Sequence, residues 1–180
     1  MSIENFSWVI PQKLSGCAMP GGFAGYNPDY LCADLTELRS HHIHTLVSLQ
    51  RMSSAFGECC RQSDLEWIHF PIEDFCAPPD SLSFDRLVKK IVRQIDASKP
   101  VCIHCHAGIG RTGLLLACVV GTYFLLDGAA AVAAVRKSRP AIDTDEQELF
   151  VYDYLQENPG TAGTSGTQSQ RKSGLKKGKR

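Results

Sequence analysis

The sequence lacks a hydrophobic run long enough to cross a membrane. Its longest apolar stretch, Leu114 to Leu126, is interrupted by Gly121 and Thr122, whereas a membrane-spanning helix needs ~20 apolar residues. The chain also does not open with the basic and apolar segments of a secretory signal peptide. We therefore expect a cytoplasmic protein with no membrane span, in which the apolar stretch forms a buried central helix.

The sequence also has no net charge, because its 19 Lys and Arg residues balance its 19 Asp and Glu residues. The distribution is uneven: residues 158–180 hold six basic residues and no acidic one, which leaves 13 basic and 19 acidic residues in 1–157. Such an acidic excess argues against a general nucleic-acid binder. We expect one globular domain over residues 1–157 and a disordered basic tail over 158–180. The tail is a candidate nuclear-import signal or tether to an anionic surface, and a solvated tail without either role is the alternative.

Eight cysteines are present, but their spacing does not predict a disulfide framework or a metal site. Cys59 and Cys60 are adjacent and therefore lack the C-x-x-C spacing of a zinc or redox site. Cys102 and Cys118 lie in apolar runs, where cysteine is usually a buried packing residue. The His104-Cys105-His106 segment has no second cluster of ligands elsewhere in the chain, so we expect no metal.

One segment joins a short apolar strand at 100–104 to a long helix at 111–126, and it reads His-Cys-His-Ala-Gly-Ile-Gly-Arg-Thr. Gly108 and Gly110 let successive backbone N–H groups face one point, and the helix N-terminus adds to the positive field. Arg111 offers a planar fork for two phosphate oxygens. The same field favours the thiolate of Cys105. We therefore expect a loop that holds a phosphate ester against a nucleophilic thiolate, with phosphate contacts from His106, Ala107, Gly108, Ile109, Gly110 and Arg111.

Other residues of this segment refine the expectation. A P-loop NTPase fits poorly, because its G-x-x-x-x-G-K-[ST] pattern needs a lysine before the hydroxyl residue, whereas Arg111 precedes Thr112. His104 is expected to orient the loop through a ring N–H, and Thr112 to place a hydroxyl near the sulfur. Whether Arg139 braces the loop is left open by the sequence.

A thiolate attack also needs an acid that protonates the leaving oxygen. Asp74 is the candidate, because it follows the apolar strand 68–72 and opens a loop over residues 75–79. Partial desolvation by Phe75 would help to keep its carboxyl protonated. Glu73 is the alternative acid. The alternative to a catalytic role for Asp74 is that its side chain only caps a turn.

Hydrophobic periodicity predicts an α/β fold, because strands alternate with helices along the chain. A helix with apolar residues at 31, 35 and 38 is expected after Asp29 as its cap, and Thr144 with Gln147 has the spacing of a capping box. The expected architecture is a central, mostly parallel sheet with helices on both faces. Further strands are expected at 6–10, 14–19, 45–49 and 66–71, and further helices at 84–95, 127–136 and 144–156.

The loop matches H-C-x-x-G-x-x-R-[ST] at every fixed position, and the chain resembles the cysteine-dependent protein tyrosine phosphatase superfamily. Within it, residues 5 to 156 resemble the small atypical dual-specificity phosphatases; further matching segments are Asn5–Val9, Thr45–Leu49, Ile72–Cys76 and Thr144–Glu148. The resemblance implies a phosphotyrosine phosphatase-like fold, Cys105 as nucleophile, Asp74 as general acid and a cysteinyl-phosphate intermediate without a cofactor. It also suggests that Gln147 helps to place the hydrolytic water, although helix capping explains this residue equally well.

We expect a monomer that acts on phosphoproteins and requires no nucleic acid. Three alternatives stay open: a phosphatase of an inositide or an RNA 5′ phosphate, a phosphate-binding pseudoenzyme, and a thiol-redox protein that uses Cys105. Superfamily members that act on inositol lipids often have lysines where this chain has His106 and Ile109, which lowers the weight of the lipid alternative.

Overall fold

A computed structural model describes residues 3–22 and 27–158 of the chain. Apart from Asn158, the tail predicted for residues 158–180 therefore lies outside the described residues. The described residues form a five-stranded sheet in the order β1-β2-β5-β3-β4. β1 and β2 pair antiparallel, and the other pairs are parallel. The strands are β1 (Ser7–Ile10), β2 (Leu14–Cys17), β3 (Thr45–Ser48), β4 (Glu66–His69) and β5 (Val101–His104).

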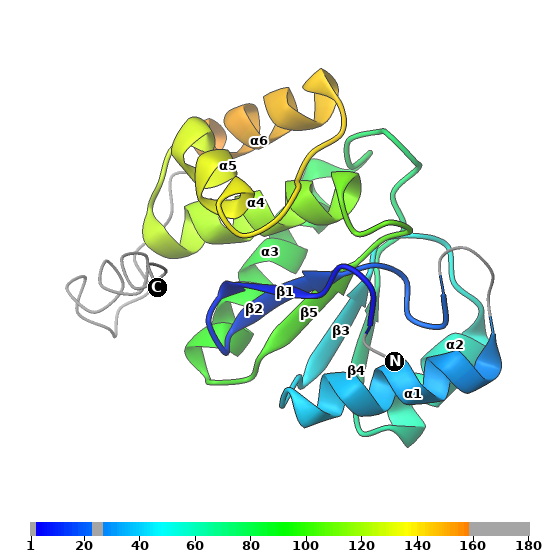
Figure 1. The fold of residues 1–180 in the computed structure, drawn as a ribbon. Coiled ribbons are helices and arrows are strands. Elements are labelled where there is room, and N and C mark those ends of the chain that lie inside the picture. The colour runs from blue at the N-terminus through cyan, green and yellow to red at the C-terminus, as the bar shows by residue number, and fades with distance from the viewer. Residues whose placement is uncertain (1–2, 23–26, 159–180) are drawn as a thin grey trace.

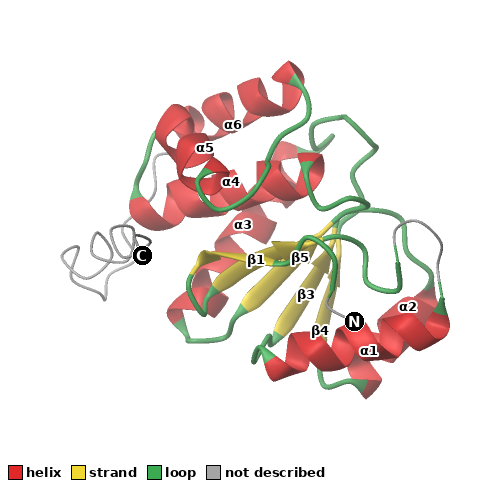
Figure 2. Ribbon diagram, viewed as in Figure 1, coloured by secondary structure: helices red, strands yellow, loops and turns green. Residues whose placement is uncertain are grey.

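Helices cover both faces of this sheet, as the sequence predicted (Figure 1). α1 (Pro28–Ser40) and α2 (Ser54–Gln62) lie on one face, where Leu35 and Phe56 share a buried cluster with Leu46 of β3. The other face carries a second and larger cluster of buried side chains. The helices around it are α3 (Ser81–Asp96), α4 (Gly110–Phe124), α5 (Gly128–Arg136) and α6 (Asp145–Glu157), drawn in red in Figure 2.

The helix that follows the candidate loop, α4, is the centre of the larger cluster. Its side chains are buried on almost all sides, including Leu114, Cys118 and Val119 at 0% exposure. It packs against α3, α5 and α6. The prediction of a buried central helix is thus correct, and α4 holds the N–H groups of its first turn in a fixed position below the loop.

Two local predictions were wrong or incomplete. The N-cap of α1 is Asn27, whose side chain accepts the N–H of Asp29, so Asp29 lies in the first turn and is not the cap. α2 was not predicted, because it is short and carries Gly57 and two cysteines, residue types that are poor helix formers. Within the described residues, no single helix is long and apolar enough to span a membrane; α4 and α5 pass that test only together, across a bend of 117°.

Candidate active site

The predicted loop lies at the carboxyl end of β5 and enters α4 at Gly110. Cys105 follows the last residue of β5, and its side chain is only 3% exposed. Gly108 has a φ of +74°, and a Cβ atom there would lie 2.2 Å from the carbonyl oxygen of Cys17. Only glycine fits at this position, because the chain approaches β2 closely in a left-handed conformation.

The carbonyl oxygens of the loop are turned outward and held there by residues from distant parts of the chain. Met19 N–H donates to the carbonyl of His106 at 2.9 Å, and Asn5 Nδ2 donates to that of Ala107 at 2.9 Å. Arg139 Nη2 donates to the carbonyl of Gly108 at 2.6 Å. Arg139 therefore does brace the loop, a role that the sequence left open.

This arrangement leaves hydrogen-bond donors without partners around the centre of the loop. The N–H groups of residues 107–110 donate to no other described residue. Arg111 Nε and Thr112 Oγ1 are buried and also lack a partner among the described residues. Since buried polar groups are normally paired, these unpaired donors mark a site for an anionic acceptor.

Thr112 Oγ1 makes no hydrogen bond to the Cys105 sulfur in this structure. The sequence analysis expected this hydroxyl near the sulfur. In the structure it lies in the first turn of α4, buried and without a hydrogen-bond partner among the described residues.

All eight cysteines are free thiols. The sulfur–sulfur contact among them joins Cys17 and Cys102 at 3.5 Å and does not involve Cys105. As predicted, Cys102 and Cys118 are fully buried.

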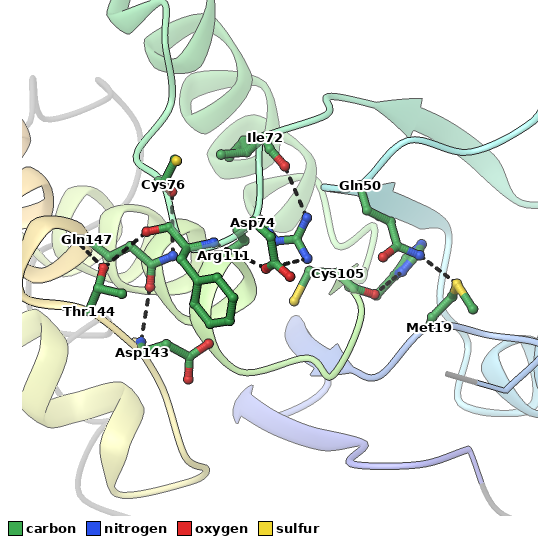
Figure 3. Close-up of polar contacts among 12 residues, drawn as sticks. Met19, Gln50, Ile72, Asp74, Cys76, Cys105, Arg111, Asp143, Thr144 and Gln147 are labelled. Carbon is green, nitrogen blue, oxygen red and sulfur yellow. Dashed lines mark hydrogen bonds and ion pairs between the residues drawn. The ribbon is translucent and has the colours of Figure 1, made fainter. Parts of the chain in front are cut away.

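The Arg111 side chain lies beneath the loop that carries the predicted general acid. Its Nη1 donates to the carbonyl of Ile72 at 3.0 Å, and its Nη2 lies 2.9 Å from Asp74 Oδ1. The Cys105 thiol points toward this ion pair (Figure 3). The structure thus brings the predicted nucleophile, anion clamp and acid together, although Asp74 is 31 residues away from Cys105 in the sequence.

The expected desolvation of Asp74 by Phe75 is not present. The Asp74 side chain is 59% exposed, and Phe75 is itself 60% exposed with a φ of +60°. The carboxylate is held by the Arg111 cation instead. The alternative acid, Glu73, instead forms an ion pair with the exposed Arg51.

His104 is fully buried and connects the loop to β3. The Cys105 carbonyl can only accept, so His104 Nδ1 donates to it at 3.0 Å, and Nε2 then accepts from Ser48 Oγ at 2.6 Å. Ser48 in turn accepts from Trp67 Nε1 at 2.9 Å. Burial lowers the pKa of His104 from its ordinary 6.5 to about 4, so the ring is neutral at pH 7, and its two hydrogen bonds hold it between the loop and β3.

The first turn of α6 holds the loop that carries Asp74. Thr144 Oγ1 donates to the carbonyl of Phe75 at 3.2 Å and also caps α6 by accepting the N–H of Gln147. Gln147 is fully buried; its Oε1 accepts from Asp143 N–H at 3.0 Å, and its Nε2 donates to the carbonyl of Cys76 at 3.5 Å (Figure 3). Gln147 is therefore placed to position the acid loop.

Several residues of the site were missed by sequence reasoning. Asp143 packs over the start of α4, since a Cβ atom on Gly110 would lie 2.2 Å from its Oδ2. Met19, Ser48 and Trp67 hold the loop from strands or turns far away in sequence. No local signal identifies them, because each acts through a contact between distant segments.

Comparisons with known proteins agree with this geometry. Residues 16–123 match the family described as "Polymorphic toxin system, DSP-PTPase phosphatase". The human dual specificity protein phosphatase CDC14C is 24% identical over 155 residues, which cover 82% of this chain and 33% of that protein. The bovine protein tyrosine phosphatase domain-containing protein 1 is 30% identical over 138 residues, 68% of this chain and 17% of that protein. The chain thus spans a third or less of the length of these relatives.

Solved structures show the same fold. A kinase associated phosphatase with its catalytic-site cysteine substituted by serine has a TM-score of 0.74 at 20% identity, covering 87% of this chain and 96% of that chain. Tk-PTP in the active form has a TM-score of 0.69 at 24% identity, with coverages of 85% and 97%. PTPMT1 has a TM-score of 0.69 at 13% identity, with coverages of 84% and 94%. These likenesses confirm the predicted fold class.

Proposed function

The chain belongs to the polymorphic toxin system DSP-PTPase phosphatase family, and on this premise we propose that it removes phosphate from phosphotyrosine and from phosphoserine or phosphothreonine in proteins. The observation that carries the proposal is the set of unpaired donors around Cys105. The free N–H groups of residues 107–110 and the buried Arg111 Nε face no acceptor among the described residues. A phosphate ester supplies both the charge and the number of acceptor oxygens that such a set of donors requires.

In the proposed first step, the Cys105 thiolate attacks phosphorus and forms a sulfur–phosphorus bond while the bond to the leaving oxygen breaks. Arg111 and the loop amides hold the equatorial oxygens. Asp74 donates its proton to the leaving oxygen, which requires that the carboxyl first separates from Arg111, since the two are ion-paired at 2.9 Å in the free protein. An arriving phosphate competes for the same guanidinium and supports this separation.

In the second step, water attacks the cysteinyl-phosphate, Asp74 accepts a proton from that water, and the sulfur leaves as a thiolate. Thr112 is available to donate to the leaving sulfur, because its buried hydroxyl has no other partner among the described residues. Both steps use only side chains of this chain, backbone amides and water.

The substrate class is tested with three peptides of one sequence that carry phosphotyrosine, phosphoserine or phosphothreonine. An inositol phosphate and an RNA with a 5′ phosphate are measured beside them. We expect kcat/KM to be highest on a phosphopeptide, with turnover lost in Cys105→Ser. Release of phosphate from the inositol phosphate or the RNA but from none of the peptides would refute the proposed substrate class and favour the alternatives left open by the sequence.

A further inference from the structure

A groove of about 870 Å³ lies at the end of the sheet opposite the catalytic loop. Its wall includes Lys13, Arg39, His41, His42, His44 and Lys99, which together define the basic groove. Lys13, His44 and Lys99 come just before β2, β3 and β5, respectively, whereas the catalytic loop follows the carboxyl end of β5. Four-residue strands separate the two sites by ~13 Å of strand.

The residues that line this groove include no Asp or Glu. Lys13 Nζ donates to the hydroxyl of Tyr123 at 3.0 Å, and Arg39 Nη1 donates to the carbonyl of Ile43 at 2.8 Å. Neutral groups therefore hold both side chains in place without cancelling their charge. Of the basic residues that line the groove, only two histidines lie within 4 Å of a described carboxylate: His41 is 3.9 Å from Glu37, and His44 is 3.9 Å from Glu66.

Lys13, Arg39 and Lys99 form no ion pair with a described carboxylate, whereas six of the other ten described Lys and Arg residues do. The paired cations are Arg51, Arg61, Lys89, Lys90, Arg111 and Arg136. Three uncompensated positive charges thus meet in one hollow on a domain whose residues 1–157 have an acidic excess.

The histidines add hydrogen-bonding groups on a packed wall. His41 stacks on Phe6 with ring centroids 4.6 Å apart and meets Trp8 edge-on at 6.5 Å. The described residues contain no group of three or more His, Cys, Asp or Glu that could hold a metal ion. Imidazole nitrogens can also hydrogen-bond to an organic ligand. The volume of the groove lies within the ~300–1,000 Å³ of typical ligand pockets.

We propose that the basic groove binds an acidic segment of the phosphoprotein substrate and so adds a docking site remote from the catalytic loop; this rests on the proposed protein-phosphatase function. The observations favour a short acidic peptide over a nucleic acid or a membrane. A flat polyanionic surface would also contact the surrounding domain, which is acidic overall and would repel it. A narrow segment places its carboxylates in the hollow alone.

Binding is tested with a fluorescein-labelled oligoglutamate peptide by fluorescence anisotropy on the full chain. Orthovanadate is added so that the catalytic loop is occupied. The variant Arg39→Glu/Lys99→Glu is compared with Arg86→Glu/Lys137→Glu, because the latter pair is also exposed, without a carboxylate ion pair among the described residues, and outside the groove. We expect roughly tenfold weaker binding in the groove variant and a much smaller loss in the control.

Peptide binding that is weakened equally in both variants, or no peptide binding by the unmodified chain, would overturn the docking proposal. Binding to vesicles that contain phosphatidylserine, lost in the groove variant and without binding to the peptide, would overturn it in favour of a membrane surface. These outcomes concern the groove alone, because they do not depend on turnover.

A kinetic test separates docking from catalysis. Two phosphotyrosine peptides share the phosphorylated sequence, and one carries an oligoglutamate extension on a flexible linker. We expect the extension to lower KM in the unmodified chain and in the control variant but not in the groove variant, with kcat and the hydrolysis of a small aryl phosphate unchanged. Hydrolysis of both peptides with one KM would refute docking and leave the proposed function intact, whereas hydrolysis of neither would refute the proposed function.

Discussion

The guanidinium of Arg139 donates to the carbonyl oxygen of Gly108 at 2.6 Å and to the hydroxyl of Ser7 at 3.1 Å, so one buried side chain links the catalytic loop to β1. The link turns the Gly108 carbonyl away from the centre of the loop. The neighbouring N–H groups are thereby left free for phosphate, and the catalytic loop depends on a residue 28 positions beyond Arg111.

Arg139→Lys is predicted to lower kcat/KM, because lysine cannot make both bonds with the geometry of the arginine fork. Loss of one charge-assisted hydrogen bond costs about 1.5–3 kcal/mol, which corresponds to roughly ten- to a hundredfold in rate. Steady-state kinetics on a small aryl phosphate measure the change. The matched control is Arg136→Lys, whose ion pair with Glu148 is on the surface; equal effects of the two variants would contradict the brace.

Asp74→Asn is predicted to tighten the binding of orthovanadate or inorganic phosphate while turnover falls. The neutral amide no longer competes with the anion for Arg111, to which Asp74 is ion-paired. Because Asp74 is exposed, the gain is modest, roughly two- to fivefold. Isothermal titration measures it.

The same variant is predicted to slow alkyl phosphates far more than activated aryl phosphates, since only the former need the proton in the first step. Weaker anion binding together with equal slowing of both substrates would assign the acid elsewhere, with Glu73 as the next candidate.

The stability of the protein is predicted to fall between about pH 6.5 and 4, because His104 is neutral in the folded chain. Burial lowers its pKa from 6.5 to about 4, so below pH 6.5 the unfolded chain takes up a proton that the folded chain does not. The stabilisation is complete above pH 6.5 and declines as the pH falls, by about 3 kcal/mol at most. Denaturant unfolding at several pH values measures the decline, and a His104→Asn variant that shows the same decline would exclude this histidine as its source.

Gln147→Ala is predicted to act on the first chemical step, because the side chain contacts the carbonyl of Cys76 in the acid loop. Alkyl phosphates should then lose more rate than aryl phosphates, as in Asp74→Asn. A role in placing the hydrolytic water predicts instead slower breakdown of the phosphoenzyme on every substrate, seen as a larger burst before steady state. Thermal unfolding of the variant controls for loss of the hydrogen bond from Asp143 N–H to the Gln147 side chain.

The sequence predicted most of the elements that are determined by residues close together in the chain. The strand, loop glycines and helix around Cys105 are contiguous, and α3 shows a strong helical periodicity with its cap at Asp80. The choice of Asp74 followed from its place after an apolar strand and from the family resemblance, whereas its ion pair with Arg111 is seen only in the structure. The exposure of Asp74 did not follow, because it depends on where Phe75 turns.

The outer supports of the loop could not be predicted. Asn5, just before β1, and Met19, just after β2, bind loop carbonyls about 100 and 90 residues away in the sequence. Ser48 reaches His104 only because β3 and β5 pair in a register that sets these residues side by side. Such contacts depend on strand order and register, which one sequence does not specify through composition or periodicity.

The central claim, that Cys105 becomes phosphorylated during turnover, is tested most directly by rapid acid quench of the chain mixed with a phosphotyrosine peptide, followed by mass spectrometry of its proteolytic fragments. We predict one added phosphate on the fragment that contains Cys105 and on no other cysteine fragment, with the adduct and the turnover both absent in Cys105→Ser. Phosphate release at the normal rate with no adduct on Cys105, or turnover that persists in Cys105→Ser, would contradict the account.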